Sequence, residues 1–336
     1  MPASTYREVR LVARPHGPLT DDLFEVVEVP MPDPAPGQVL VRNTAMTVTA
    51  VMRTLMDEAE APDVPMRAYA LGEPPHGLAV GEVVAAPGAE LAPGALVRHR
   101  QSWREYSLLD ASAVQPIDPD ALPDPAAHLA QGATAWMGVV RGAEVRAGDT
   151  VFVSGAAGGV GSLAGQIARL RGAGRVIGST SSQAKADYLT GELGFDAVVL
   201  RVAGPIGEQL RAAAPDGIDA MVDNVGGEQL QAALAAARRG ARFALVGALA
   251  SQLSGAGPQP TRIDTLSFVA RGITLRGVAL FDHPDAVAAW QREFGPGLRA
   301  GTLKFPHVRL HGVEQAPRAL SELVEGRHIG AVIVEL

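Results

Sequence analysis

The chain of 336 residues contains no cysteine, which excludes disulfides, a thiol nucleophile and any zinc site with cysteine ligands. The net charge of −7 comes without clusters of basic residues, which argues against nucleic acid or an anionic membrane as the main partner. No apolar stretch reaches the length of a membrane span, and the N-terminal MPASTYREVR has no signal-peptide core. We therefore expect a soluble, cytoplasmic protein.

The most informative segment is TVFVSGAAGGVGSLAGQIARL, Thr150 to Leu170. A short apolar run typical of a buried strand is followed by glycines at intervals of three, Gly155, Gly158 and Gly161, and then by apolar residues at helical spacing. This order is typical of a dinucleotide site, in which backbone N–H groups and a helix N-terminus face a pyrophosphate. An ordinary glycine-rich turn between strand and helix is the alternative, and the correct flanks favour the cofactor site.

The next strand-like segment, GRVIGSTSSQAKADYL, indicates which dinucleotide binds. Sites for NAD usually carry an acidic residue at the end of this strand, about 20 residues past the first glycine. Here Ser179 and Thr180 occupy that place, and no carboxylate occurs before Asp187. Lys185, one of two lysines in the chain, adds a positive charge. A solvated lysine in the first turn of a helix is the alternative, but with the missing acid the pattern favours the 2′-phosphate of NADP(H).

The pattern of strand-like and helical segments changes twice along the chain, and these changes predict the domain boundaries. Residues 1–123 hold short strand-like runs between proline and glycine turns, typical of a mainly antiparallel β domain. Residues 124–299 alternate strand and helix, with helices expected at 207–214 and 228–238, which predicts a doubly wound parallel sheet. Residues 300–336 are expected to return to the first domain. The fold class is therefore α/β, a Rossmann sheet inserted into a β domain.

Several motifs give the chain a family resemblance: QVLVRNTAMTVTAVMR, LGEPPHGLAVGEVV, SWREYSLLD, GATAWMGV, ELGFDAVV, GIDAMVDNVGGE and EGRHIGAVIVEL, together with the glycine-rich segment. In this order they resemble the zinc-independent medium-chain dehydrogenase/reductase superfamily, in the branch of leukotriene B4 12-hydroxydehydrogenase/prostaglandin reductases and plant alkenal double-bond reductases. The resemblance implies a GroES-like catalytic domain and an NADPH-dependent reductase of C=C bonds conjugated to a carbonyl. It also implies no metal, a small enone or enoyl substrate, and a homodimer.

The resemblance also implies which residues contact NADP(H). Lys185 matches the lysine that holds the 2′-phosphate, and Arg201 stands where relatives usually have a phosphate-contacting tyrosine. His328 replaces an asparagine that usually contacts the cofactor. Asn224 and Thr134 match cofactor-contacting residues, although a turn cap and a buried hydroxyl are the respective alternatives. The full expected set is Thr134, Gly155, Ala156, Ala157, Gly158, Gly159, Val160, Gly161, Ser179, Thr180, Lys185, Arg201, Asn224, Gly247, Ala248 and His328.

On the substrate side the chain departs from the family. Relatives often line the pocket with tyrosines at positions that correspond to Val51, Leu78 and approximately Gln252, so we expect a more apolar pocket here. The polar catalytic candidates that remain are His76, Tyr69, Gln252 and Thr49. Any one of eight histidines is more often a surface or packing residue than an acid. The reaction does not require a side-chain acid, because water can protonate the enolate after hydride transfer.

Two other functions remain open at this point. A quinone oxidoreductase needs only an open nicotinamide, and a non-catalytic NADPH-binding protein is conceivable because the tyrosines are missing. The altered pocket also suggests a tailoring reductase that acts on a bulky secondary metabolite. An assay of quinones against enones would separate these possibilities.

Overall fold

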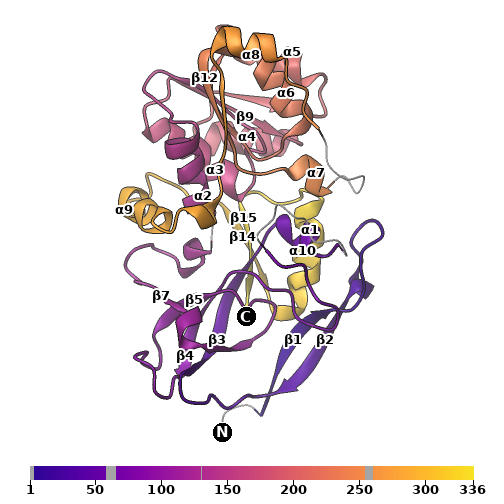
Figure 1. Ribbon diagram of the computed structural model, residues 1–336, viewed down its shortest axis with the longest axis vertical. Coiled ribbons are helices and arrows are strands. Elements are labelled where there is room, and N and C mark those ends of the chain that lie inside the picture. Colours follow the sequence, from indigo (N-terminus) through magenta and orange to yellow (C-terminus); the bar gives the residue numbers. More distant parts are fainter. Residues whose placement is uncertain (1–3, 58–65, 130, 254–259) are drawn as a thin grey trace. The chain divides into compact units, whose positions relative to one another are not determined.

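The computed structural model describes residues 4–57, 66–129, 131–253 and 260–336. The chain divides into two compact units (Figure 1). The first unit comprises Met1–Ala130, His307–Arg327 and Val332–Leu336, and the second comprises Gln131–Pro306 and His328–Ala331. The chain thus enters the second unit at 130/131 and leaves it at 306/307, each seven residues beyond the point expected from the sequence, and it returns to this unit for residues 328–331. The short helix η3 (Pro125–His128) accounts for the first difference, because it packs on strands β3 and β4 of the first unit.

The first unit is built on an antiparallel β-sheet, as predicted. Within the described residues, the seven-stranded sheet has the order β14-β15-β3-β4-β5-β7, with β6 paired to β3, and β1 and β2 form a separate antiparallel pair. Its strands are β1 (Thr5–Leu11), β2 (Phe24–Pro30), β3 (Gln38–Val48), β4 (Ala79–Ala85), β5 (Leu96–His99), β6 (Tyr106–Asp110), β7 (Gln115–Pro116), β14 (His307–His311) and β15 (Ala331–Glu335). Its helices are α1 (Val51–Leu55) and α10 (Ala316–Val324), with short turns η1 (Asp21–Leu23), η2 (Ala111–Ala113) and η6 (Val313–Gln315).

A buried polar cluster ties the strands of the first unit together around His99. His99 is 2% exposed; its Nδ1 accepts from the Gln101 N–H, so Nε2 carries the proton and donates to Asn43 Oδ1 at 2.9 Å. The Asn43 amide in turn donates to Ser107 Oγ and to the Arg104 carbonyl. Burial and the nearby Arg104 charge lower the pKa of His99 to about 4. The imidazole is therefore a neutral structural group at pH 7.

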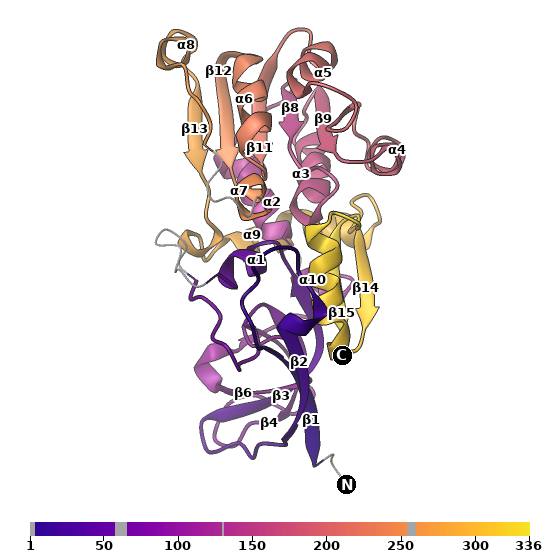
Figure 2. The same ribbon diagram turned by 90° about the vertical axis from the view of Figure 1, so that its right-hand side faces the viewer.

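The second unit contains the predicted parallel sheet. Within the described residues, its six strands have the order β10-β9-β8-β11-β12-β13, and Figure 2 shows β13, β12, β11, β8 and β9 side by side. The strands are β8 (Thr150–Val153), β9 (Arg175–Thr180), β10 (Ala197–Leu200), β11 (Ile218–Asp223), β12 (Ala237–Leu245) and β13 (Thr274–Gly277). Pairing within this sheet is parallel. Val151, Phe152 and Val153 are fully buried, as expected for a strand covered on both faces.

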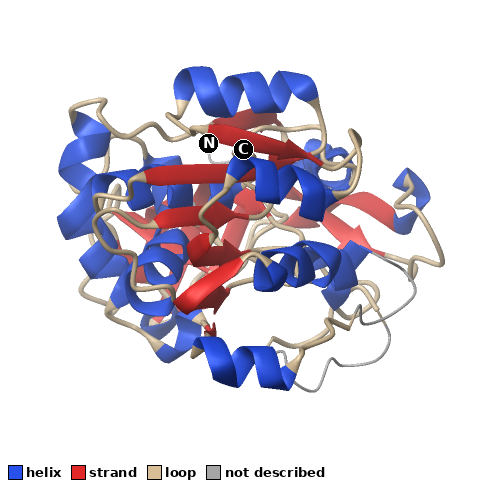
Figure 3. Ribbon diagram, turned by 90° about the horizontal axis from the view of Figure 1, so that it is seen from above, coloured by secondary structure: helices blue, strands red, loops and turns tan. Residues whose placement is uncertain are grey.

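Helices, coloured blue in Figure 3, connect these strands. They are α2 (Gly132–Trp136), the π-helical turn η4 (Met137–Gly142), α3 (Gly159–Leu170), α4 (Gln183–Glu192), α5 (Ile206–Ala213), α6 (Gly227–Ala235), α7 (Leu249–Leu253), α8 (Thr265–Arg271), η5 (Leu280–Asp282) and α9 (Ala286–Arg299). The helix expected at 228–238 ends three residues early, because Ala237 already pairs with Ile218 as the start of β12. None of the helices described here has the length and apolarity needed to cross a membrane.

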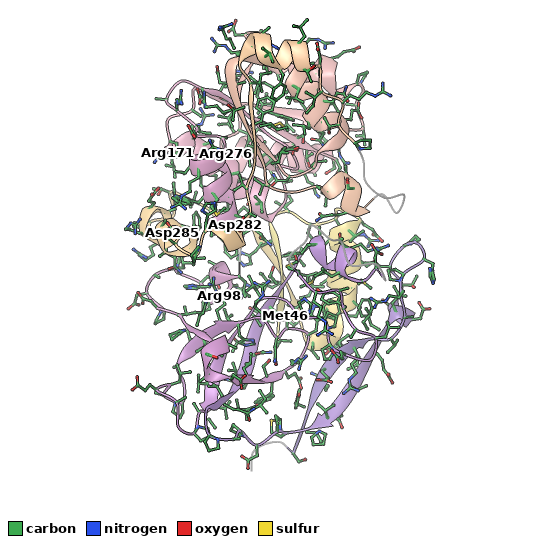
Figure 4. All side chains as sticks on the ribbon, in the orientation of Figure 1. Met46, Arg98, Arg171, Arg276, Asp282 and Asp285 are labelled. Atoms are coloured by element: carbon green, nitrogen blue, oxygen red, sulfur yellow. The ribbon has the colours of Figure 1, made fainter. Side chains whose placement is uncertain are left out.

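Helix α9 is fixed to the preceding helices by side-chain contacts within the second unit. Arg141 donates to Asp285, at the start of α9 (Figure 4), at 3.1 Å, and its guanidinium lies 4.9 Å from the centroid of the Trp136 ring. The indole Nε1 of Trp136 donates to Glu293 at 3.0 Å. Gly132 is required here, since a Cβ at this position would come within 2.4 Å of the Trp290 ring. The start of α2 is therefore held against α9.

The sheet order reverses at β8. From β8 the chain proceeds through β9 to β10 on one side, and then through β11 and β12 to β13 on the other side. In open α/β sheets of this kind, ligands bind beyond the carboxyl ends of the strands at the point of reversal. The fold thus points to the loops that follow β8 and β11.

Candidate cofactor site

The loop between β8 and α3 has the geometry that its glycines predict. Gly155 has φ +58°, a left-handed conformation that favours glycine. A Cβ on Gly161 would lie 2.4 Å from the Gly155 carbonyl oxygen and 2.7 Å from Ala156 Cα, so the close approach of α3 to the loop requires glycine. At Gly158, by contrast, the nearest atom to such a Cβ is the Gly155 oxygen at 3.5 Å. The loop therefore presents accessible backbone where α3 begins.

Strand β9 supports this loop from one side. Ser179 is fully buried; its Oγ accepts from the Gly155 N–H at 3.0 Å and donates to the side chain of Gln229, while its carbonyl accepts from Ala156 N–H at 2.8 Å. Ser179 belongs to the set expected to contact NADP(H), and its one hydroxyl proton goes to Gln229 in this structure, so donation to a phosphate oxygen would require that bond to break. Thr180 is also buried, and its carbonyl accepts from the Arg201 N–H.

The end of β11 supports the loop from the other side through Asp223 and Asn224. The fully buried Asp223 carboxylate accepts from Ser154 Oγ at 2.6 Å and from the N–H groups of Val225 and Gly226. The Asn224 amide donates to the Ser154 carbonyl at 2.7 Å, so Asn224 links the ends of β8 and β11. Burial raises the pKa of Asp223, and its hydrogen bonds oppose that rise. Asp223 thus fixes both loops at the point where the sheet order reverses.

A short segment from near the C-terminus, residues 328–331, completes the loop within the second unit. The Gly330 N–H donates to the Ala157 carbonyl at 2.8 Å, and Gly158 and Gly330 form a parallel bridge. A Cβ on Gly159 would meet Gln131 Oε1 at 2.4 Å and Ala331 Cα at 3.3 Å. The half-buried His328 lies at the start of this segment. Residues Ala157 to Gly159 are therefore covered on one side by Gln131 and this segment.

Two cations lie together beyond the end of β9. Lys185, in the first turn of α4, is 9% exposed, and its N–H donates to the N-cap Ser182. Arg201 is exposed and follows β10, the strand next to β9. Burial and the charge of Arg201 lower the pKa of Lys185. Like charges this close repel each other, so an anion that contacts both would be bound favourably.

The remaining cofactor residues expected from the sequence lie in the same unit. Thr134 is half-buried in α2. Gly247 and Ala248 are exposed in the turn after β12, where a Cβ on Gly247 would be 2.9 Å from the Asn224 carbonyl oxygen. Because β11 and β12 are neighbours, this turn lies beside the end of β11. These backbone groups thus belong to the edge of the sheet where the glycine-rich loop lies.

The polar substrate candidates of the first unit gather around His76. The Tyr69 hydroxyl donates to the His76 carbonyl at 2.9 Å, and the two rings meet edge to face at 4.7 Å. Burial raises the pKa of Tyr69, which makes its phenol a poor acid. Burial, with Arg100 and Arg67 nearby, lowers the pKa of His76.

The other substrate candidates are half-buried. Thr49 precedes α1, and its carbonyl accepts from Met52 N–H; Val51 is the first residue of α1; and Leu78 accepts from Thr47 N–H through its carbonyl. Gln252 lies in α7 of the second unit, just before residues 254–259, which are outside the described part. In the part of the chain that is described, no three His, Asp or Glu side chains form a group that could hold a metal.

Sequence reasoning missed several residues of the loop's support. The β8–α3 loop is held by hydrogen bonds that involve Ser154, Asp223 and Gln229. It is covered by Gln131 and Gly330. Asp223 stands inside the DNVGG motif, and an acid directly after the apolar residues 220–222 of a buried strand is a signal for a buried, hydrogen-bonded role. The contacts of Gln131 and Gly330 carry no such local signal.

Comparison with known proteins places these features in a family. Residues 7–117 match the N-terminal domain of oxidoreductase family, and residues 159–293 match the family described as zinc-binding dehydrogenase. The chain is 32% identical to YfmJ of Bacillus subtilis strain 168, a candidate NADP-dependent oxidoreductase, over 99% of this chain and 98% of that protein. It is 30% identical to the NADP(+)-dependent 2-alkenal reductase of Nicotiana tabacum, over 88% and 86% of the two chains.

Among solved structures, the chain is similar to CurA from Vibrio vulnificus in complex with NADPH. The TM-score is 0.88, with 28% identity and 98% of both chains covered. The sequence matches extend over nearly the whole chain, and the parallel sheet and the antiparallel β domain agree with this likeness. The chain belongs to the medium-chain dehydrogenase/reductase superfamily, in the zinc-independent branch that includes the alkenal and prostaglandin reductases.

Proposed function

We propose that the protein is an NADPH-dependent reductase of carbon–carbon double bonds conjugated to a carbonyl. The observation that carries the proposal is the cation pair Lys185 and Arg201 beside a glycine-rich loop, in a chain 30% identical to a 2-alkenal reductase. In this proposal the second unit is the NADP-binding domain, which the sequence placed at residues 124–299, and the first unit is the catalytic domain, which the sequence placed at residues 1–123 and 300–336.

The residues of the loop fit NADP(H). The backbone near Gly158, at the N-terminus of α3, would receive the pyrophosphate, and Lys185 with Arg201 would hold the 2′-phosphate. Asp223 and Ser179 keep the loop in shape without contacting the cofactor. The proposed contact set is Thr134, Gly155, Ala156, Ala157, Gly158, Gly159, Val160, Gly161, Thr180, Lys185, Arg201, Asn224, Gly247, Ala248 and His328.

The bound cofactor supplies a hydride, which the β-carbon of the enone accepts. The electron pair of the C=C bond moves toward the carbonyl and gives an enolate, and the α-carbon then takes a proton. His76 is neutral at pH 7, because its pKa is lowered, and the Tyr69 hydroxyl is both engaged with a carbonyl and weakly acidic. We therefore assign the proton to water, and a neutral His76 to hydrogen bonding with the substrate.

The apolar side chains Val51 and Leu78 are proposed to face the alkene. Where a tyrosine is replaced by a smaller apolar residue, the space admits an extra ring, and the cost of removing water from a hydroxyl disappears. Bulky cyclic enones are therefore the proposed preferred substrates, which would suit a tailoring enzyme of secondary metabolism.

The proposal is tested by NADPH oxidation with a panel of enones, alkenals and quinones, together with product analysis. We expect saturated ketones from enones and little turnover of quinones. If the protein reduces quinones but neither enones nor alkenals, the proposed activity is wrong and the protein is a quinone reductase. Cofactor binding without turnover on any member of the panel would favour a non-catalytic NADPH-binding protein.

We further propose that the protein is a homodimer formed through the second unit. Strand β13 lies at the edge of the parallel sheet, and the adjacent α8 exposes Leu266 and Val269 at 77% and 80%. An open strand edge with apolar residues beside it is suited to pairing with a second copy of itself. Analytical ultracentrifugation should then give the mass of a dimer for the wild type and that of a monomer for the L266E/V269E variant. The same mass for the two proteins would contradict this interface.

A further inference from the structure

The surface around His76 also holds two arginines, Arg67 and Arg100. The Gly77 N–H donates to the Arg100 carbonyl at 3.1 Å, so the chain segment that carries His76 runs beside Arg100. The Arg100 guanidinium lies 3.6 Å from the Met66 sulfur, next to Arg67 in the chain. Segments 66–69, 76–78 and 100–102 therefore converge on one small surface of the first unit.

Close packing fixes this surface against α1. A Cβ on Gly77 would lie 2.5 Å from Met52 Cε and 2.8 Å from Ser102 Oγ, so Gly77 packs closely against both side chains. Met52 is buried in α1, the helix that Val51 begins, and Leu78 follows Gly77 directly. Of the two proposed pocket residues, Leu78 thus belongs to the segment that carries His76, and Val51 directly precedes Met52, which packs against that segment.

Among the residues that the structure describes, Arg67 and Arg100 form no ion pair, unlike most arginines of the first unit. Both are exposed, and neither has a carboxylate within 4 Å among the residues that the structure describes. The thioether that Arg100 contacts is a weak acceptor. The arginines that do form ion pairs in this unit are Arg7, Arg10, Arg42, Arg53, Arg309, Arg318 and Arg327.

Burial, followed by the charges of Arg100 and Arg67, lowers the pKa of His76, in line with the convergence of the three segments. Two cations at one place attract an anion, and a guanidinium binds a carboxylate or phosphate through two parallel hydrogen bonds.

We propose that Arg67 and Arg100 bind an oxyanion carried by the substrate, beside the pocket formed by Val51 and Leu78. This inference rests on the proposed reductase function. The oxyanion is either a carboxylate of the substrate itself or a phosphate of a carrier thioester, and both chemistries suit a guanidinium pair.

The test compares two matched substrate pairs. One is a long-chain enone with a terminal carboxylate and its methyl ester; the other is crotonyl-coenzyme A and the crotonyl thioester of N-acetylcysteamine. In the pair that carries the oxyanion bound by the arginines, the charged substrate should have a kcat/KM about tenfold higher than the neutral one, mainly through a lower KM. This difference should become smaller as salt is added. R67A and R100A should each reduce this ratio, whereas R42A, which removes an exposed, ion-paired arginine of the same unit, should keep it.

The outcomes separate the inference from the function. A response in the first pair assigns the arginines to a substrate carboxylate, and a response in the second assigns them to a carrier phosphate. Equal kcat/KM within both pairs, or a ratio that R67A and R100A leave unchanged, overturns the inference and leaves the reductase function intact. Failure to reduce even the neutral members overturns the reductase function and this inference with it.

Discussion

Removal of the two cations beyond β9 should convert the protein from an NADPH-preferring to an unselective enzyme. The buried Lys185 would make one charge-assisted contact with the 2′-phosphate, and such a contact typically contributes about 1.5–3 kcal/mol. Arg201 is exposed, so solvent screening reduces its contribution to about 0.5–1 kcal/mol. The sum of about 2–4 kcal/mol corresponds to a Kd for NADPH about 30 to 700 times higher in the K185A/R201A variant. The Kd for NADH, which has no 2′-phosphate, should change little.

Titration of both cofactors by nicotinamide fluorescence measures this selectivity directly. The matched control is K304A, which removes the other lysine of the chain, an exposed residue paired with Glu192 at 2.6 Å. It should leave both Kd values unchanged. Parallel losses for NADPH and NADH in K185A/R201A would refute the assignment of these residues to the 2′-phosphate.

The repulsion between the two cations provides a second readout. Because Arg201 lowers the pKa of Lys185, the R201A variant without cofactor should unfold at the same temperature as the wild type or higher. The increase in Tm on addition of NADPH should be smaller in R201A, since the stabilisation grows with the ratio of ligand concentration to Kd. A lower Tm of the cofactor-free variant would show that Arg201 has a structural role.

Four further predictions concern single residues. The pKa of His99 is about 4 in the folded state and that of an unfolded histidine is about 6.5. Because the unfolded state then binds a proton more readily, His99 should lower the free energy of unfolding by about 3 kcal/mol between pH 6.5 and pH 4. In urea denaturation, the H99Q variant should lose less stability over this pH range. D223N places an amide N–H2 against N–H donors, so we expect a loss of about 1–3 kcal/mol in urea denaturation and weaker NADPH binding; an unchanged Tm would contradict the buried network. G161A should destabilise the protein by at least about 1–3 kcal/mol through overpacking, whereas G191A, in α4 with open space around it, should be neutral or stabilising in thermal unfolding. L78Y should shift the kcat/KM ratio of cyclic enones to short alkenals toward the alkenals; an unaltered ratio would remove this residue from the pocket.

The sequence predicted those features that depend on local pattern. Apolar runs, glycine spacing and the strand–helix rhythm predicted the parallel sheet and its loop, because a buried strand and a tight turn constrain the residues that form them. Gly161 is the clearest case. A Cβ at this position would lie 2.4 Å from the carbonyl oxygen of Gly155, so the spacing of the two glycines reflects a direct contact between their backbones.

Features that depend on distant partners could not be read in the same way. Ser179 has the residue type of a phosphate donor, but its hydroxyl is used by Gln229, which lies 50 residues later in the chain. Arg238 is expected from the sequence to be the polar end of a helix, yet pairing of Ala237 with Ile218 places it in β12. The cover that Gln131 provides over Gly159 likewise depends on tertiary packing.

The bridge between Gly158 and Gly330 has a consequence for biosynthesis. During translation the ribosome delivers the β8–α3 loop about 170 residues before Gly330 emerges, while domains fold as units on the timescale of synthesis. A nascent chain can therefore assemble the parallel sheet early, but its glycine-rich loop lacks the N–H donor of Gly330 to the Ala157 carbonyl until residues 328–331 leave the exit tunnel. Completion of the loop is thereby coupled to the synthesis of residues 328–331, and a chain that ends before Gly330 would lack this N–H donor.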